Sequence, residues 1–266
     1  MVRKLSNLSV QGVDLSFQRA GKGARLVVLH GAKDFYAWHP IHDILAEHFE
    51  VIAPVHPGFG GTARGKDVET VDDLAYLYLD LIHESDWAPV HLVGAGLGGW
   101  IAAEMAVRES SRLASLTLVD AVGIKVSPPE IPDIVDVSTM TEDNKNARLW
   151  HDLAVGIERV GDPKTMSEDD LEVYLANEVA ETLYTWKPYM HNPALRRRLH
   201  RVRVPTQVLW GAFDGVVAPT YGEAYAAGIP DARFEIIANA GHMPHIERPA
   251  ETAGAIVQFL QQSVAS

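Results

Sequence analysis

Three stretches of the chain carry residues whose types and spacing could do chemistry together. HLVGAGLGGW, at residues 91–100, is a glycine turn that follows an apolar run, while Asp214 and His242 lie in LWGAFDGVVAP and NAGHMPHIERP. A histidine oriented by a carboxylate is a general base, and a turn that opens a helix presents backbone N–H groups to a developing negative charge. Taken singly, an aspartate or a histidine after a strand is usually a capping or surface residue, so a shared role for these residues depends on the rest of the chain.

Short apolar runs predict the strands that must position these residues. Nearly continuous runs are typical of strands buried on both faces of a parallel sheet, and helical patterns lie between several of them. The runs are RLVVLH, FEVIAPV, PVHLVG, LASLTLVD, TQVLWG and RFEIIA, and the helical patterns cover 40–49, 71–85, 97–109 and 249–262. Alternating apolar and polar residues around Gly12 predict an N-terminal β-hairpin. We therefore expect an α/β fold with a mostly parallel central sheet and helices on both faces.

One long segment interrupts the alternation of strands and helices. Residues 123–204 contain no strand pattern, and Ser167 with Asp170 has the spacing of a capping box before a helix. We expect residues 1–122 and 205–266 to form the core domain, and residues 123–204 to form a helical lid inserted into it.

Composition limits the function classes. A chain of 266 residues with 47% hydrophobic residues is sized for one globular domain with an insertion. Its formal charge of −12 argues against a nucleic-acid partner, and the run RRRLHRVR at 196–203 is expected to be a solvated helix end. It has no cysteine, which excludes thiolate chemistry. No signal peptide or membrane span is expected, so the cytoplasm is the expected location.

The glycine turn alone allows two interpretations. Gly94, Gly96 and Gly99 spell G-x-G-x-x-G, and Asp120 follows the next strand where a ribose-binding acid of a dinucleotide site would lie. The same residues are also G-x-S-x-G with Gly96 in place of serine. The dinucleotide fingerprint normally opens its sheet, whereas here two strands and a hairpin come first.

Four motifs in order favour the second interpretation. LHGAKDF follows one strand, HPGFGG follows the next, and the glycine turn, Asp214 and His242 come after them. Nearly the whole chain therefore resembles the α/β-hydrolase superfamily. The resemblance implies a serine, acid and histidine triad in that order, with Gly96 at the nucleophile position. It also implies an oxyanion hole formed by the backbone N–H groups of Ala32 and Leu97, and no cofactor.

Other candidate residues have weaker patterns. Asp120 is either an acid at an alternative position of this fold or a structural turn residue, and we favour the turn. His39 and His42, like His242 and His245, are spaced as metal ligands, but no H-E-x-x-H occurs, so no metal is expected. Aromatic residues of the insertion are usually core residues, yet a lid must supply apolar walls to a pocket. We assign substrate contact to Trp150, Trp186 and Tyr189.

Three explanations of Gly96 remain open. The chain is a serine hydrolase of carboxylic esters, lactones or related acyl substrates that has lost its nucleophile; or it uses His242 as a general base without serine, as a lyase, a cyclase or a direct hydrolase; or it is a non-catalytic ligand-binding protein. Hydrolysis of C–C bonds competes with ester hydrolysis within the first explanation. In each case the partner is a small molecule rather than a membrane, and a homodimer is an alternative to a monomer.

Overall fold

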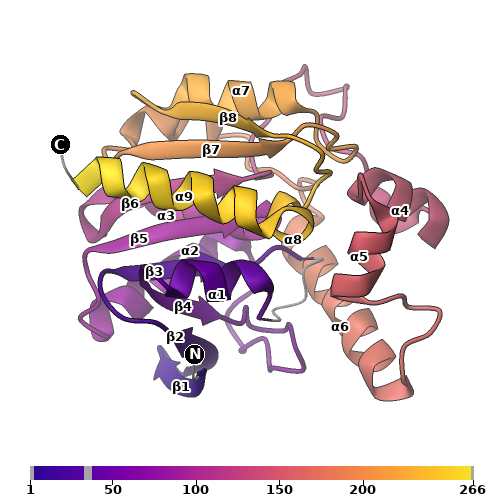
Figure 1. The fold of residues 1–266 in the computed structure, drawn as a ribbon, viewed down its shortest axis with the longest axis horizontal. Coiled ribbons are helices and arrows are strands. Elements are labelled where there is room, and N and C mark those ends of the chain that lie inside the picture. The colour runs from indigo at the N-terminus through magenta and orange to yellow at the C-terminus, as the bar shows by residue number, and fades with distance from the viewer. Residues whose placement is uncertain (1–2, 33–37, 265–266) are drawn as a thin grey trace.

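An eight-stranded sheet forms the centre of the computed structural model, which describes residues 3–32 and 38–264 (Figure 1). The strand order is β1-β2-β4-β3-β5-β6-β7-β8. The strands are β1 (Lys4–Val10), β2 (Val13–Ala20), β3 (Arg25–Leu29), β4 (Glu50–Pro54), β5 (Val90–Ala95), β6 (Leu113–Val119), β7 (Thr206–Gly211) and β8 (Arg233–Ile237). Strand β2 pairs antiparallel with β1 and β4, and the remaining neighbours are parallel. The predicted hairpin and all six predicted strands are present.

Helices cover both faces of the sheet. Helices α1 and α9 lie on one face, and α2, α3 and α7 lie on the other (Figure 1). The helices of these two layers are α1 (Pro40–Ala46), α2 (Val71–Glu84), α3 (Gly96–Arg108), α7 (Pro219–Gly228) and α9 (Pro249–Val264), with the short α8 (Pro244–Glu247) before α9. In β3, Leu26 and Val28 pack toward α1 and α9, while Val27 and Leu29 pack toward α2 and α3. This alternation is why the predicted run is apolar throughout.

Strand β8 differs from its prediction. Its apolar run predicted burial on both faces, but Ile236 is 42% exposed and Arg233 and Glu235 are exposed as well. Strand β8 is the last strand of the sheet and pairs only with β7. An edge strand has less cover than a central one, and charged side chains there also discourage pairing with another chain.

The chain between β6 and β7 is helical. It contains α4 (Glu142–Leu149), α5 (Leu153–Val160) and α6 (Glu168–Thr185), with 3-10 helices at Val137–Thr139 and Arg196–Arg201. A further 3-10 helix, Ser110–Arg112, lies just before β6. Residues 123–204, all of which the structure describes, contain isolated bridges but no strand of the sheet. Ser167 caps α6 by accepting the N–H of Asp170, as its spacing predicted.

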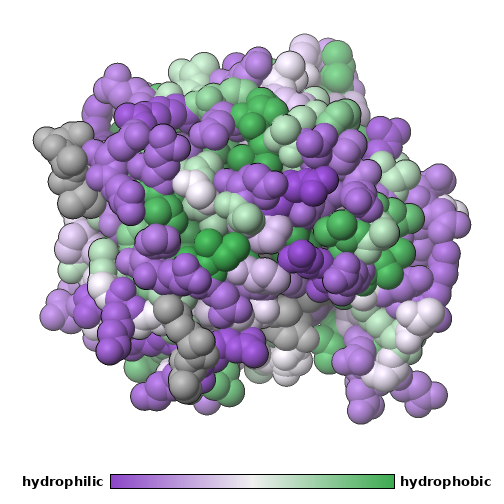
Figure 2. All heavy atoms as spheres, in the orientation of Figure 1, coloured by the Kyte–Doolittle hydropathy of each residue, from purple (hydrophilic) through white to green (hydrophobic). Residues whose placement is uncertain are grey.

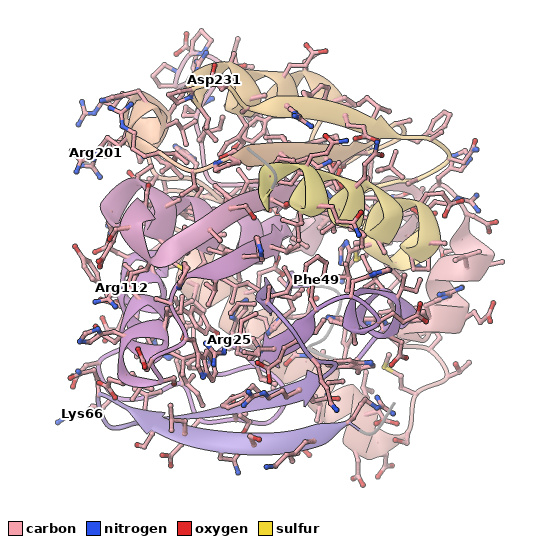
Figure 3. The ribbon with its side chains drawn as sticks, turned by 60° about the vertical axis from the view of Figure 1, so that its left-hand side comes forward. Arg25, Phe49, Lys66, Arg112, Arg201 and Asp231 are labelled. Atoms are coloured by element: carbon pink, nitrogen blue, oxygen red, sulfur yellow. The ribbon has the colours of Figure 1, made fainter. Side chains whose placement is uncertain are left out.

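The surface of the molecule is polar over most of the face in Figure 2, with an apolar patch over α5 that includes Leu153 and Ile157. The basic run lies on the other side of the molecule, where the exposed Arg201 points outward (Figure 3). Among the residues that the structure describes, no helix combines the length and apolar character needed to cross a bilayer.

Asp133 fixes the first loop after β6 and gives a testable pH dependence. Its carboxylate pairs with Lys125 at 2.8 Å and accepts the N–H groups of Val126 and Ser127 at 2.8 and 2.9 Å. Burial opposes its ionisation, but these bonds outweigh burial and lower its pKa from 3.8 to about 2. A depressed pKa stabilises the folded state above pH 4 and loses that effect as the pH falls toward 2.

We therefore expect Asp133→Asn to lower the free energy of unfolding by about 1–2 kcal/mol at pH 7, with the difference from the parent chain vanishing near pH 2. Urea unfolding between pH 7 and 2.5 measures it. The exposed Asp67→Asn variant is the control. An Asp133→Asn difference that stays constant with pH would contradict the ionic role.

Candidate active site

The glycine turn joins β5 to α3 and brings several backbones into contact. A Cβ on Gly98 would lie 2.2 Å from the carbonyl oxygen of Leu29, and a Cβ on Gly94 would lie 2.3 Å from that of Gly98. Gly99 is equally restricted by a neighbouring alanine side chain at 2.5 Å. Real Cβ atoms do not approach other atoms so closely, so these three positions need glycine for space.

Gly96 differs from the other glycines of the turn. Its φ is +49°, and among the residues that the structure describes a Cβ built on it would meet nothing nearer than 3.8 Å, where it would contact Gly31 Cα and His242 Nε2. This is ordinary van der Waals distance. Position 96 therefore has room for a side chain, at the modest cost of a left-handed backbone conformation, and that side chain would point at the ring of His242.

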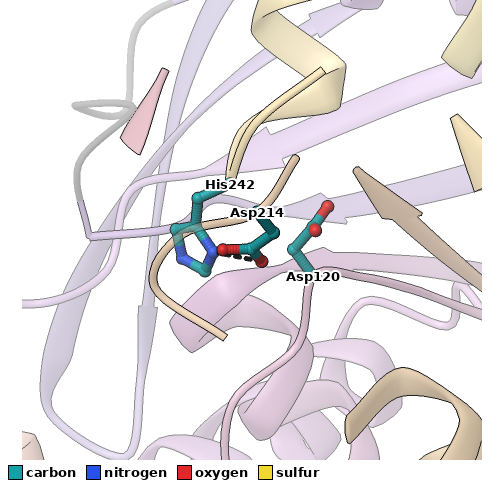
Figure 4. Close-up of side chains that lie close together, drawn as sticks. All are labelled: Asp120, Asp214 and His242. Carbon is teal, nitrogen blue, oxygen red and sulfur yellow. Dashed lines mark hydrogen bonds and ion pairs between the residues drawn. The ribbon is translucent and has the colours of Figure 1, made fainter. Parts of the chain in front are cut away.

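Asp214 and His242 form a hydrogen-bonded pair beside Gly96 (Figure 4). Asp214 follows β7 and His242 follows β8, and Nδ1 of His242 lies 2.9 Å from Oδ2 of Asp214. The N–H groups of Val216 and Val217 donate to the other carboxylate oxygen at 2.8 and 2.9 Å. The carboxylate is thus held by three donors and fixes the tautomer in which Nε2 of His242 faces Gly96 as a base.

The insertion holds both turns that carry this pair. At the end of α4, the carbonyl oxygen of Arg148 accepts the N–H of Gly215 at 3.1 Å, and that of Leu149 accepts the N–H of His242 at 2.8 Å. These are two consecutive carbonyl groups of the last helical turn, and such carbonyls accept no hydrogen bond within the helix. The alignment of the acid with the base therefore depends on α4 as well as on the sheet.

A buried carboxylate makes a second connection between the insertion and the turn of the base. Glu247, in α8, is only 4% exposed. Its two oxygens accept the N–H groups of Gly241 at 2.6 Å and of Asp152, at the start of α5, at 2.7 Å. Glu247 therefore joins the residue before the histidine to the insertion.

Two histidines in contact support the loop that carries Ala32. The rings of His30 and His56 lie 3.8 Å apart, and the N–H of His56 donates to Nε2 of His30 at 2.9 Å. Nε2 of His56 lies 2.9 Å from the carbonyl oxygen of His30, and its Nδ1 lies 2.6 Å from the hydroxyl of Tyr78. One set of neutral tautomers satisfies all three bonds, so the two rings fix the backbone just before Ala32.

A pocket that is partly open to solvent joins these parts. Gly96, His242, Ala32 and Leu97 all line it. Leu97 is the second residue of α3, where helix geometry leaves the backbone N–H without an intrahelical acceptor. The other walls are mostly apolar and include Val122, Ile134, Val137, Leu149, Val216 and Met243. The arrangement can hold an apolar acyl group with a base on one side and backbone donors nearby.

Comparison with known proteins identifies this arrangement. The sequence profile described as the Alpha/beta hydrolase family matches residues 26–255. The chain belongs to the alpha/beta hydrolase family. The match favours the interpretation of the glycine turn as the nucleophile turn of that family over the dinucleotide fingerprint.

Relatives of this alpha/beta hydrolase are named for different activities. The monoacylglycerol lipase ABHD6 of Mus musculus is 24% identical over 275 residues, which cover 91% of this chain and 77% of the relative. A 2-hydroxy-6-oxo-6-(2'-aminophenyl)hexa-2,4-dienoic acid hydrolase of Metapseudomonas resinovorans is 26% identical over 267 residues, covering 94% and 89%. The crystal structure of a membrane phospholipase A superposes with a TM-score of 0.78 at 22% identity, over 99% of this chain and 87% of that chain.

The structure brings one of the three predicted substrate-contact residues of this alpha/beta hydrolase to the pocket. Tyr189 lines it, together with Met190, and donates to Asp136 at 3.2 Å. Trp150 instead packs in the core against Gly156 and does not line the pocket. Trp186 is 62% exposed and lines a separate groove. Aromatic type indicated an apolar surface for these side chains but not which surface they cover.

Some of the potential metal ligands of the hydrolase form hydrogen bonds within the chain. Asp120, Asp214 and His242 offer ligand atoms within 4.8 Å of one another, but the bonds described above use both oxygens of Asp214 and Nδ1 of His242. Nδ1 of His42 accepts the N–H of His39 at 3.0 Å at the start of α1, which is a helix-capping contact. Both oxygens of Asp214, Nδ1 of His242 and Nδ1 of His42 therefore serve internal hydrogen bonds.

Several supporting residues of the hydrolase site had no assigned role in the sequence. His30 and His56 belonged to motifs that indicated the fold, but their mutual contact joins two separate loops. Glu247 lies five residues after His242 and was not singled out. Its role depends on two backbone donors, and one of them, Asp152, comes from the insertion.

Proposed function

We propose that this chain has the active site of an ester or lactone hydrolase that acts on apolar acyl substrates, with the nucleophile removed. The observation that carries the proposal is the open position at Gly96. A Cβ there would lie 3.8 Å from Nε2 of His242, so an oxygen one bond further out could reach the roughly 2.6–3.2 Å needed for proton transfer. His242, Ala32 and Leu97 line the same pocket as this position.

The proposed reaction would follow the steps of a serine hydrolase of this family. A nucleophilic oxygen at position 96 would give its proton to Nε2 of His242 and attack the acyl carbon, while Asp214 stabilises the resulting imidazolium. The N–H groups of Ala32 and Leu97 would bind the oxyanion. In this chain Gly96 supplies no oxygen, so the acyl-enzyme cannot form.

We infer the substrate class from the walls of the pocket and from the names of the relatives. Its walls are mostly apolar, which suits a neutral acyl chain. One relative is named a monoacylglycerol lipase, whose substrate is an ester, and another cleaves a C–C bond in a dienoic acid. We rank ester and lactone substrates first because the pocket offers apolar walls to the acyl chain.

A second candidate uses water instead of serine. The open space at Gly96 borders Nε2 of His242, which is where a water molecule would have to stand to lose a proton to the base. The water oxygen would attack the acyl carbon, His242 would take its proton, and the same proton would pass to the leaving alkoxide. This direct hydrolysis forms no covalent intermediate.

Three chains test the proposal: the parent, Gly96→Ser and Gly96→Ala. Each is incubated with a fluorophosphonate probe and with a p-nitrophenyl ester of a short acyl chain. We expect only the Gly96→Ser variant to be labelled, once per chain, and to show a burst of p-nitrophenol followed by turnover. The alanine variant has the same unfavourable backbone conformation and the same Cβ atom but no oxygen, so it is the matched control.

The outcomes separate the candidates. Turnover by the parent that is lost in both Gly96→Ala and His242→Ala, without labelling, supports the water mechanism. A folded Gly96→Ser variant that neither labels nor turns over any ester or lactone overturns the proposed function. Circular dichroism and the thermal midpoint confirm that each variant is folded.

A further inference from the structure

Asp120 is a second buried carboxyl group behind the Asp214–His242 pair. It follows β6, on the strand next to the one that carries Asp214, and is fully buried. Oδ1 accepts the N–H of Gly211 at 2.9 Å, whereas Oδ2 is buried and meets no hydrogen-bond donor in the part of the chain that the structure describes. Buried polar atoms are nearly always paired, so this oxygen needs an explanation.

The explanation lies in the neighbouring carboxylate. Ligand atoms of Asp120, Asp214 and His242 lie within 4.8 Å of one another, and Figure 4 shows the three side chains side by side. Oδ1 of Asp214 already accepts two backbone N–H groups, but Oδ2 accepts only Nδ1–H of His242. A carboxylate oxygen has about two acceptor positions, so Oδ2 retains one.

Two ionised carboxylates cannot be neighbours here at reasonable cost. Both side chains are buried, and like charges at this range repel strongly in a medium of low dielectric. One proton resolves both problems, because it turns the unpaired oxygen of Asp120 into a donor and leaves a single negative charge. Asp214 must be the ionised partner, since three N–H donors face it and only one faces Asp120.

We propose that Asp120 is a neutral carboxylic acid whose Oδ2–H donates to Oδ2 of Asp214, which makes it a positioning residue for the Asp214–His242 pair. It adds a fourth donor to the carboxylate. Because Asp120 and His242 share one oxygen as acceptor, the proton on Asp120 also withdraws charge from that oxygen and moderates the basicity of His242.

Electrostatics support this assignment. Burial raises the pKa of Asp120 well above its usual range, and the charge of Asp214 and a hydrogen bond with it act in the same direction. The charge of Glu247 raises the pKa further, while the N–H of Gly211 opposes the shift. The titratable groups around Asp120 are therefore Asp214, His242 and Glu247, and two of the three are acidic.

The test uses the pKa of His242, measured by ¹⁵N NMR in the parent chain, in Asp120→Asn and in Asp120→Ala. The signal is assigned by its loss in His242→Gln. Asparagine has the same shape, can accept from Gly211 and can donate to Asp214, but it cannot ionise. We expect Asp120→Asn to leave the pKa of His242 unchanged and Asp120→Ala, which removes a donor from Asp214, to raise it by about 1.

Two other patterns would overturn the proposal. If Asp120 is ionised, both variants remove a negative charge and lower the pKa of His242 by about 1–2. If Asp120 only fills space, neither variant changes it. Because the measurement needs no substrate and no serine, it is independent of whether the proposed ester hydrolysis is correct.

A stability measurement keeps the test decisive if Asp120→Ala does not fold. A neutral Asp120 keeps its proton in the folded parent, whereas the unfolded chain releases it above pH 4, so the parent loses stability as the pH rises. The Asp120→Asn variant lacks this loss. We expect its thermal midpoint, relative to that of the parent, to rise steadily from pH 4 to 7. A difference that is flat or falls with pH would show that Asp120 is ionised.

Discussion

In the Gly96→Ser variant, replacing His242 by alanine is expected to lower kcat for an activated ester by about 10⁴-fold or more. The reason is geometric, since Nε2 of His242 lies within reach of the position that a serine oxygen would occupy. Without the imidazole, a serine hydroxyl would have to lose its proton to water. Steady-state kinetics with a p-nitrophenyl ester measure the loss.

Asp214→Asn is expected to cost about as much in the same background, because an amide that donates to Nδ1 would hold His242 in the wrong tautomer. The two losses should not add in the double variant, since the residues act as a unit. His200→Ala is the control, because that histidine is exposed and lies in the basic run. An Asp214→Asn variant within threefold of its parent would show that the pair is not the catalytic base.

Gly98→Ala is expected to lower the free energy of unfolding by more than about 4 kcal/mol, or to prevent folding. The added methyl group would stand 2.2 and 2.6 Å from two consecutive carbonyl oxygens of the β3 end. These atoms are backbone, so relief requires α3 to move away from the sheet. Urea unfolding, or the yield of folded protein, measures the effect.

Two other glycines provide controls for this prediction. Gly96→Ala, two residues earlier, places its methyl group in open space, so only the φ of +49° is unfavourable. We expect this change to lower the free energy of unfolding by about 1 kcal/mol. Gly254→Ala in α9 meets nothing within 4 Å and should stabilise by up to about 1 kcal/mol. Similar losses at Gly98 and Gly96 would mean that the turn is less tightly packed than described.

The sheet was predictable because its signals are local. Runs such as RLVVLH are apolar at every position, and this pattern follows directly from cover on both faces of β3. The exposure of β8 was not predictable in the same way, because its run is also apolar in part. Whether a strand is central or at the edge depends on the order of the strands, which no single run contains.

The candidate site was predictable where side-chain type determines the role. Asp214 and His242 each follow a strand within a family motif, and the structure places them 2.9 Å apart. The contributions of Arg148 and Leu149 are made by main-chain carbonyls, which any residue possesses. The environment of Asp120 depends on a carboxylate 94 residues later in the chain, so its buried, unpaired oxygen could not be seen in the sequence.

The hydrogen bonds from α4 to the turns that carry Asp214 and His242 limit how the insertion could be replaced. A chimera that replaced the whole segment between β6 and β7 would remove both carbonyl acceptors, at Arg148 and Leu149, and the N–H of Asp152 that Glu247 binds. The Asp–His pair would lose its alignment although neither residue had been changed. An exchange that preserves the pair would therefore have to keep α4 and Asp152 in place.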